Sequence, residues 1–136
     1  MSYLLDTRLA ESSVWVADLP LSELRLKNHQ HYPWCILIPR VSDICELYEL
    51  NAEQQMMLMQ EIKQVSIVMK TLFAPMKLNV ASLGNVVSQL HVHIVARQKS
   101  DPLWPQGIWQ QALVEEPYRD VDLEAFIRQL RTGLAQ

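Results

Sequence analysis

The sequence contains few of the residues on which several classes of protein depend. It has three glycines and two cysteines in 136 residues, and no repeat, low-complexity segment or Gly/Ser-rich linker. Two cysteines, Cys35 and Cys45, are too few for a disulfide framework or a zinc knuckle, so we expect two buried, reduced thiols. The chain length suits one core, and the shortage of glycine argues against linkers. We therefore expect a single domain over residues 1–136.

Long runs of one chemical character are also missing. No apolar run approaches the roughly 20 residues that span a bilayer, and the first residues do not resemble a signal peptide. The formal net charge is −3 and basic residues form no cluster. A nucleic acid polymer is therefore not expected as a partner, and neither is a membrane. We expect a cytoplasmic protein, for which a small phosphate ligand stays possible because backbone amides bind phosphate without net charge.

The sequence does contain clear strand and helix patterns. β-branched and aromatic residues, period-two alternation and short apolar runs predict strands at Ser13–Asp18, 23–28, Trp34–Pro39, Leu78–Ala81 and Leu90–Ala96. Apolar residues spaced by three and four predict helices at Ala52–Leu72 and Asp122–Thr132, and a short helix is expected at 3–11. The strands at 23–28 and Trp34–Pro39 are expected to form a hairpin. Together the elements predict an α+β fold, with an antiparallel sheet of about five strands, one long central helix and a C-terminal helix.

The two longer helices carry local signals of their own. Asn51 can cap the long helix, with Gln54 three residues later in a capping-box arrangement. The polar side of this helix, which includes Glu61, is expected to face solvent. Gly133 is placed to end the last helix.

Three planar polar side chains alternate along the segment before Ile94. In a strand, Gln89, His91 and His93 leave the same face, while the residues between them point into the core. Two chemistries fit this spacing. Imidazoles at i and i+2 can share a metal ion, and His29 and His31 offer a second such pair, although these two fall in a predicted turn.

The second chemistry is covalent catalysis at phosphorus, which we favour. A neutral imidazole attacks phosphorus without bringing negative charge toward a phosphate, and water can later displace it. Its other nitrogen must donate to a fixed acceptor, so that the attacking nitrogen keeps its lone pair. A neighbouring histidine can bind phosphate oxygens or handle the proton of the leaving group.

The segment GNVVSQLHVHIVARQKSDPLWPQGIW resembles the signature region of the histidine-triad (HIT) hydrolases. Their motif is His-x-His-x-His followed by two apolar residues, and nearly the whole chain follows the order of elements in that family. The chain most closely resembles a bacterial branch with diadenosine tetraphosphate hydrolases. The resemblance implies a HIT-like fold and cleavage at the α-phosphate of a nucleotide.

The resemblance also implies roles for the residues of the motif. His91 takes the place of the nucleophile, and His93 takes the third place, with a phosphate-side and proton-handling role. Gln89 occupies the first place, where the motif has histidine. A glutamine can donate to a phosphate oxygen and its carbonyl can fix the tautomer of His91, but it cannot titrate at neutral pH.

Other positions correspond to the family outside the motif. Asn85 matches a position that contacts phosphates, and Gly84 allows close approach of the backbone. Asn28 lies near the ribose-binding position, and Cys35 falls where several members have another histidine. The segment that contains Trp104 lies near the active site in the family and often reaches the partner subunit.

The resulting prediction is an enzyme, a homodimer that hydrolyses or transfers a small-molecule nucleotide. The substrate would be a phosphoanhydride or phosphoramidate, such as a dinucleoside polyphosphate or an adenylate. No cofactor is expected to be required, although Mg²⁺ could arrive with a polyphosphate substrate. Because Gln89 and Cys35 remove two imidazoles, a non-catalytic nucleotide-binding module is the alternative, and a histidine metal site is a third. Arg97, just after the motif, is expected to anchor structure rather than clamp phosphate.

Overall fold

The computed structural model describes residues 2–109 and 113–135, and an antiparallel five-stranded sheet organises it. The strands are β1 (Ser13–Asp18), β2 (Ser22–Lys27), β3 (Trp34–Pro39), β4 (Lys77–Ala81) and β5 (Val92–Arg97), in the spatial order β1-β2-β3-β5-β4. The helices are α1 (Thr7–Glu11), a 3₁₀ turn η1 (Leu47–Glu49), α2 (Ala52–Phe73) and α3 (Asp120–Leu134). The expected α+β fold is confirmed.

The centre of the sheet consists of β3 and β5, which are buried along their whole length. Both segments are largely apolar, as strands covered on two faces must be. Their antiparallel register places Ile36 opposite His93 and Trp34 opposite Val95. The start of β3 and the second histidine of the motif are therefore held next to each other by backbone pairing.

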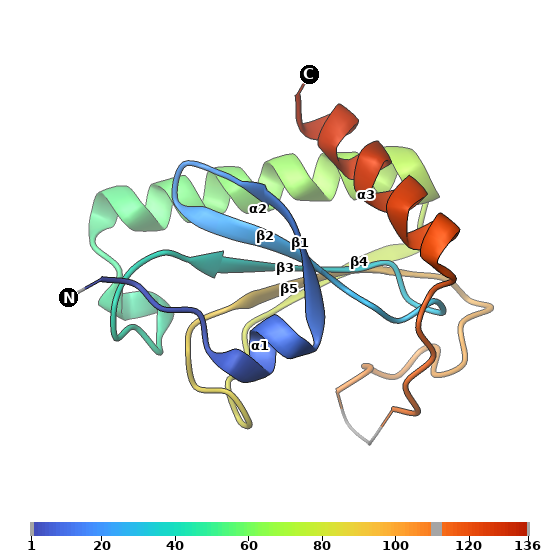
Figure 1. The fold of residues 1–136 in the computed structure, drawn as a ribbon, viewed down its shortest axis with the longest axis horizontal. Coiled ribbons are helices and arrows are strands. Elements are labelled where there is room, and N and C mark those ends of the chain that lie inside the picture. Colours follow the sequence, from blue (N-terminus) through green and yellow to red (C-terminus); the bar gives the residue numbers. More distant parts are fainter. Residues whose placement is uncertain (1, 110–112, 136) are drawn as a thin grey trace.

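The larger part of the core lies between the sheet and the two long helices. Figure 1 shows α2 and α3 above the strands, with α1 and the N-terminal segment below them. Leu24, Cys35 and Ile94 from the strands pack with Val65 of α2 and Phe126 of α3. The apolar stripe predicted for α2 is thus the surface that covers this face. Asn51 and Gln54 form the predicted capping box, and Ala74 in the left-handed conformation (φ 42°) ends the helix before Pro75.

The opposite face of the sheet has a smaller core. Leu9 of α1 packs with Trp34 and Ile36 of β3, Val87 and Ile108. Only short segments cover this face, whereas long helices cover the other. Space is therefore left beside β5. Both motif histidines are on this side, since Val92 and Ile94 between and after them belong to the larger core.

Three expectations about individual residues are wrong. Glu61 is 3% exposed, and its two carboxylate oxygens accept hydrogen bonds from the backbone N–H groups of Leu21 (2.7 Å) and Ser22 (3.0 Å). Gly133 does not end α3; it lies inside the helix, where a Cβ atom would meet Cγ1 of Val68 at 2.7 Å. Cys45 is exposed, whereas Cys35 is buried as expected.

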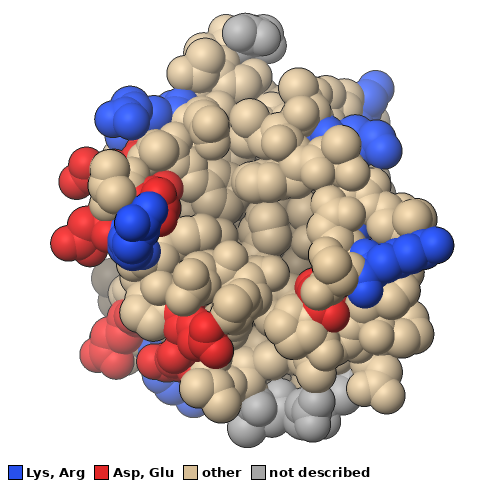
Figure 2. Space-filling view, turned by 90° about the vertical axis from the view of Figure 1, so that its right-hand side faces the viewer, with Lys and Arg blue, Asp and Glu red and all other residues tan. Residues whose placement is uncertain are grey.

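The surface carries dispersed charge on the face seen in Figure 2. Basic side chains are scattered around the edge of this view, acidic ones gather along one side, and the centre is largely uncharged. None of the described helices is both long enough and apolar enough to cross a membrane.

Candidate active site

A cavity of about 400 Å³ lies beside β5 on the less covered face of the sheet. Both motif histidines line it, together with α1, the end of β2, the start of β3 and the turn at residues 83–87. Polar and aromatic groups converge there from parts of the chain far apart in sequence, chiefly Arg8, Lys27, Asn85, His91, His93 and Trp109.

His91 is held in one tautomer by a local hydrogen bond. Its Nδ1 lies 2.7 Å from the carbonyl oxygen of Gln89. A carbonyl only accepts, so Nδ1 carries the proton and Nε2 keeps its lone pair. Burial lowers the pKa of His91 below its ordinary value, and the positive charge of Lys27 adds to this, against a smaller opposing effect of the hydrogen bond. His91 is therefore a neutral imidazole with a basic nitrogen at pH 7.

His93 is held in the opposite tautomer. The indole Nε1 of Trp34 lies 2.9 Å from Nδ1 of His93, and an indole only donates. The proton of the neutral ring is therefore on Nε2. Burial lowers the pKa of His93 to about 3, with further contributions from His91 and Lys27. His93 can donate a hydrogen bond into the cavity, but it stays neutral at physiological pH.

This arrangement changes the expected role of His93. A neutral imidazole that gave up its Nε2 proton would become an imidazolate, which is not stable at neutral pH. The geometry supports the phosphate-side part of the predicted role, in which Nε2–H donates to an oxygen. It does not support the proton-handling part.

Gln89 contributes to the site through its backbone rather than its side chain. Its carbonyl orients His91, as the sequence predicted. Its side-chain amide turns to the N-terminal segment, where Nε2 donates to the carbonyl of Leu4 and Oε1 accepts from the N–H of Asp6, both at 2.8 Å. The side chain does not line the cavity that holds the histidines.

Gly84 and Asn85 are both brought to this cavity, as predicted. Gly84 has φ +83°, a conformation that a residue with a Cβ rarely adopts, so the turn requires glycine. Lys27 lies on the same cavity and donates to Ser12 (2.8 Å). Burial lowers the pKa of Lys27. A lysine beside a glycine turn and a neutral imidazole forms a suitable environment for an anion.

Asn28 lies on an adjoining cavity of about 340 Å³. The two cavities share Lys27, Trp34 and Ser12, so together they form a continuous surface. Oδ1 of Asn28 accepts from the backbone N–H of Tyr118 (2.9 Å), which fixes the orientation of its amide. Asn28, the expected ribose contact, therefore lies on the cavity next to the one that the histidines line.

Trp104 does not line either cavity. It packs on Arg97, whose guanidinium carbon lies 5.8 Å from the ring centroid. Trp109, from the same segment, lines the cavity and lies 5.3 Å from the His93 ring, centroid to centroid. Arg97 is buried in an ion pair with Asp101 (2.7 Å), which agrees with its expected structural role.

Cys35 also lies outside the site. It is fully buried in the core beneath α2, and burial raises the pKa of its thiol to about 12. Trp34 is the residue of β3 whose side chain reaches the histidines. Because neighbouring strand residues point to opposite faces, Cys35 faces away from the site, and the expectation that it takes the place of a histidine in the pocket was wrong.

The geometry also bears on the metal alternative. Nε2 of His29 lies 3.1 Å from the carbonyl of Val114, and Nε2 of His31 contacts the carboxylate of Glu116. Within residues 2–109 and 113–135, no three His, Cys, Asp or Glu side chains form a group able to hold a metal ion. The second histidine pair ties the segment before α3 to the β2–β3 turn.

Several residues that line the cavity were not predicted from the sequence, among them Arg8, Lys27, Trp34 and Trp109. Arg8 and Lys27 are single basic residues without a motif. The aromatic content of the segment from Pro102 to Trp109 was a usable signal, but it did not distinguish Trp109 from Trp104. Trp34 is the first residue of a continuous apolar run, so no polar–apolar alternation indicated which face of β3 it occupies.

The site is thus an α+β sheet that holds two neutral imidazoles in fixed tautomers beside a glycine turn. Residues 8–100 match the HIT domain, and the chain belongs to this family. No curated protein sequence matches the chain.

Solved structures agree with this assignment. A histidine triad protein from Bradyrhizobium japonicum is 38% identical, with a TM-score of 0.95 over 98% of this chain and 99% of that one. One from Marinobacter aquaeolei is also 38% identical, with a TM-score of 0.95 over 100% and 98%. One from Sinorhizobium meliloti is 35% identical, with a TM-score of 0.92 over 96% of both chains.

Proposed function

We propose that this protein is a nucleotide hydrolase or transferase that cleaves at the α-phosphate through a nucleotidyl-histidine on His91. The observation that carries the proposal is the hydrogen bond from Nδ1 of His91 to the carbonyl of Gln89, which leaves Nε2 unprotonated. His91 lines the same cavity as Gly84 and Asn85, where a phosphate would be bound. A dinucleoside polyphosphate of the diadenosine tetraphosphate type is the substrate class that the sequence resemblance favours.

The first step forms a bond between Nε2 of His91 and the α-phosphorus. The bond from phosphorus to the leaving-group oxygen breaks, and its electron pair leaves with that oxygen. In the second step, water attacks the phosphorus, the P–N bond breaks, and its electron pair returns to Nε2 as a nucleoside monophosphate forms. The proton of the water passes to solvent.

The surrounding groups stabilise the negative charge that collects on the phosphoryl oxygens. Nε2–H of His93 can donate to one of them, because Trp34 holds the proton on that nitrogen. Lys27 supplies positive charge, and Asn85 an amide donor. Gln89 occupies, on this proposal, the first motif position and acts through its backbone. Asn28 would contact the ribose from the adjoining cavity.

The same proposal includes the remaining expectations. The ligand is a small nucleotide, the protein acts as a cytoplasmic homodimer of a single HIT-like domain, and Trp104 reaches toward the partner subunit. No cofactor takes part in the steps above, and Mg²⁺ would enter only with a polyphosphate substrate.

The experiment combines a panel of substrates with trapping of the intermediate. Diadenosine tetraphosphate, an adenylate and adenosine 5′-phosphoramidate are tested, and the product nucleotide is identified. Acid-quenched samples are digested and searched by mass spectrometry for a nucleotidyl adduct on His91. His91→Asn should abolish turnover and the adduct while nucleotide binding, measured by calorimetry, changes little.

The matched control is His31→Asn, because His31 is an exposed histidine outside the cavity. This variant should keep full turnover. Undiminished turnover in His91→Asn would overturn the assignment. Nucleotide binding by the wild type without turnover or adduct would instead favour the non-catalytic binding module.

A further inference from the structure

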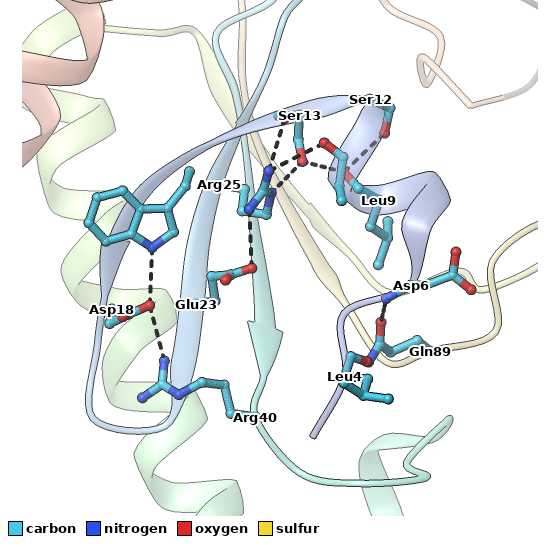
Figure 3. A network of polar contacts seen from close by, with 12 residues as sticks. Leu4, Asp6, Leu9, Ser12, Ser13, Asp18, Glu23, Arg25, Arg40 and Gln89 are labelled. Atoms are coloured by element: carbon cyan, nitrogen blue, oxygen red, sulfur yellow. Dashed lines mark hydrogen bonds and ion pairs between the residues drawn. The ribbon is translucent and has the colours of Figure 1, made fainter. Parts of the chain in front are cut away.

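The N-terminal segment is fixed to the motif by the side chain of Gln89. The amide donates to the carbonyl of Leu4 and accepts from the N–H of Asp6, so both of its polar atoms are used across 83 to 85 residues of sequence (Figure 3). One donated and one accepted hydrogen bond is the pattern by which two paired strands bind each other, and here a side chain takes the place of one strand. A glutamine provides it because its amide offers a donor and an acceptor side by side.

The other end of α1 is fixed as well. Arg25 of β2 donates to the carbonyl of Ala10 (3.3 Å). It also donates to the carbonyl (3.1 Å) and the hydroxyl (2.7 Å) of Ser13, as Figure 3 shows. Leu9 is buried against the second face of the sheet. The five-residue helix is therefore held at both ends, and its position relative to the cavity is defined.

Arg8 is the charged residue that α1 presents to the cavity, next to the apolar Leu9. It lines the cavity together with Asn85 and His91. Its Nη1 donates to the carbonyl of Val86 (3.0 Å), in the turn on the phosphate side, while Nε and Nη2 bind the carboxylate of Asp6 (3.1 and 3.0 Å). A guanidinium has five N–H donors. Three are used in these bonds, so two remain for a ligand.

Electrostatics give this pair a further effect. Asp6 lies close enough to His91 for each charge to affect the pKa of the other. A carboxylate alone at this place would repel a polyphosphate. Arg8 neutralises that carboxylate and, as a residue that lines the cavity, keeps two N–H donors for an anion.

We propose that Gln89 is a positioning residue that holds the N-terminal segment against the cavity, and that this places Arg8 to bind the anionic leaving group of the substrate. The inference rests on the proposed function. It assigns residues 4–8, which the motif does not include, to the half of the substrate that departs when the phosphorus–oxygen bond breaks.

The test compares two substrates that share the adenylyl group. The leaving groups of both depart without needing a proton. Diadenosine tetraphosphate releases a nucleoside triphosphate, whereas adenosine 5′-(p-nitrophenyl phosphate) releases nitrophenolate, which has no phosphate. Arg8→Ala should lower kcat/KM for diadenosine tetraphosphate by about ten- to a hundredfold, the equivalent of one charge-assisted hydrogen bond. It should change kcat/KM for the nitrophenyl ester by less than about threefold.

Gln89→Leu keeps the approximate size of the side chain and removes both hydrogen bonds. It should reduce the preference for diadenosine tetraphosphate in the same direction, and it should speed hydrogen exchange at the Asp6 amide. In the Arg8→Ala background it should cause no further loss of preference, because Gln89 acts through Arg8. Arg8→Lys keeps the charge and should recover part of the preference.

Two matched controls test whether any lost arginine or amide gives the same result. Arg119 is exposed and pairs with Asp122 on α3, as Arg8 pairs with Asp6, and Gln64 donates to the carbonyl of Leu134. Arg119→Ala and Gln64→Leu should leave the preference unchanged. Because the Arg8 side chain is 57% exposed, its removal should leave the fold intact, as circular dichroism would show.

The outcomes separate this inference from the proposed function. If the wild type turns over neither substrate and forms no His91 adduct, the proposed function fails. If the wild type is active but Arg8→Ala lowers kcat/KM for both substrates equally, or for neither, Arg8 does not bind the leaving group. If Arg8→Ala behaves as expected while Gln89→Leu is additive with it, or has no effect on the preference, the positioning role of Gln89 is overturned.

Discussion

The hydrogen bond between Trp34 and His93 can be tested by removing a single donor. Trp34→Phe keeps an aromatic ring at the start of β3 and deletes the indole N–H that holds the proton of His93 on Nε2. The acceptor Nδ1 is then left unpaired in a site where His93 is 4% exposed. An unpaired buried acceptor costs about 1–3 kcal/mol, which corresponds to a shift of about 5- to 150-fold in the ratio of the two tautomers.

Three measurements check this expectation. The ¹⁵N chemical shifts of His93 should report a mixture of tautomers in place of one. Turnover should fall in proportion to the population that leaves the Nε2–H tautomer, which is about twofold when the two tautomers become equally populated. The free energy of unfolding, measured in urea, should fall by about 1–3 kcal/mol.

The matched control is Trp15→Phe, which deletes an indole N–H that donates to Asp18 at an exposed position of β1. This variant should leave the His93 spectrum and turnover unchanged. Unchanged ¹⁵N shifts and turnover in Trp34→Phe would refute the reasoning. A loss of stability without a change of tautomer would refute it equally, because Trp34 would then act by packing alone.

The remaining predictions concern stability. Burial lowers the pKa of His93 to about 3, whereas in the unfolded chain this pKa has its ordinary value of about 6.5. Between these pH values only the unfolded chain binds the proton. The contribution of His93 to folding stability is therefore complete above about pH 6.5 and is lost as the pH decreases. Urea unfolding should show that His93→Gln loses about 2 kcal/mol less than the wild type between pH 7.5 and 5, and equal losses would contradict this. Glu61→Gln should lower the free energy of unfolding by about 1–3 kcal/mol, because an amide group would face a backbone N–H, whereas exposed Glu53→Gln should change little. Gly133→Ala should lower stability despite the better helix propensity of alanine, because its Cβ would meet Val68 at 2.7 Å; a gain in thermal stability would show that Val68 moves aside at little cost.

Much of the fold could be predicted because its elements are marked locally. Two of the strands, β1 and β3, have the predicted bounds, and the capping box at Asn51 places the start of α2 at the predicted residue. Apolar spacing and caps depend on residues within one or two turns of each other. Such signals are available in the sequence.

What could not be predicted depends on partners distant in sequence. Glu61 has the place of a solvent-facing residue on its helix, and only the β1–β2 turn, 39 to 40 residues away, makes it a buried acceptor. The same holds for the side chain of Gln89, whose partners lie 83 to 85 residues away. Periodicity predicts on which face of a helix or strand a side chain lies. It does not predict which backbone groups will pack against that face.

The candidate site divides in the same way. The sequence gives the tautomer of His91, because Gln89 and His91 are two residues apart and their hydrogen bond is local. The tautomer of His93 depends on the register between β3 and β5, which brings Trp34 across from the motif. Local geometry could thus be derived for one histidine and not for the other.

Position 89 serves the two halves of the proposed reaction with different parts of one residue. Its carbonyl orients the nucleophile, and its side chain holds the segment that carries Arg8. Every amino acid has that carbonyl, so the orientation of His91 does not depend on which side chain stands at 89. On the proposed function, a different side chain at 89 would change the selectivity for the group released, while His91 would keep its geometry. On this proposal, selectivity can vary at position 89 independently of the chemistry at His91.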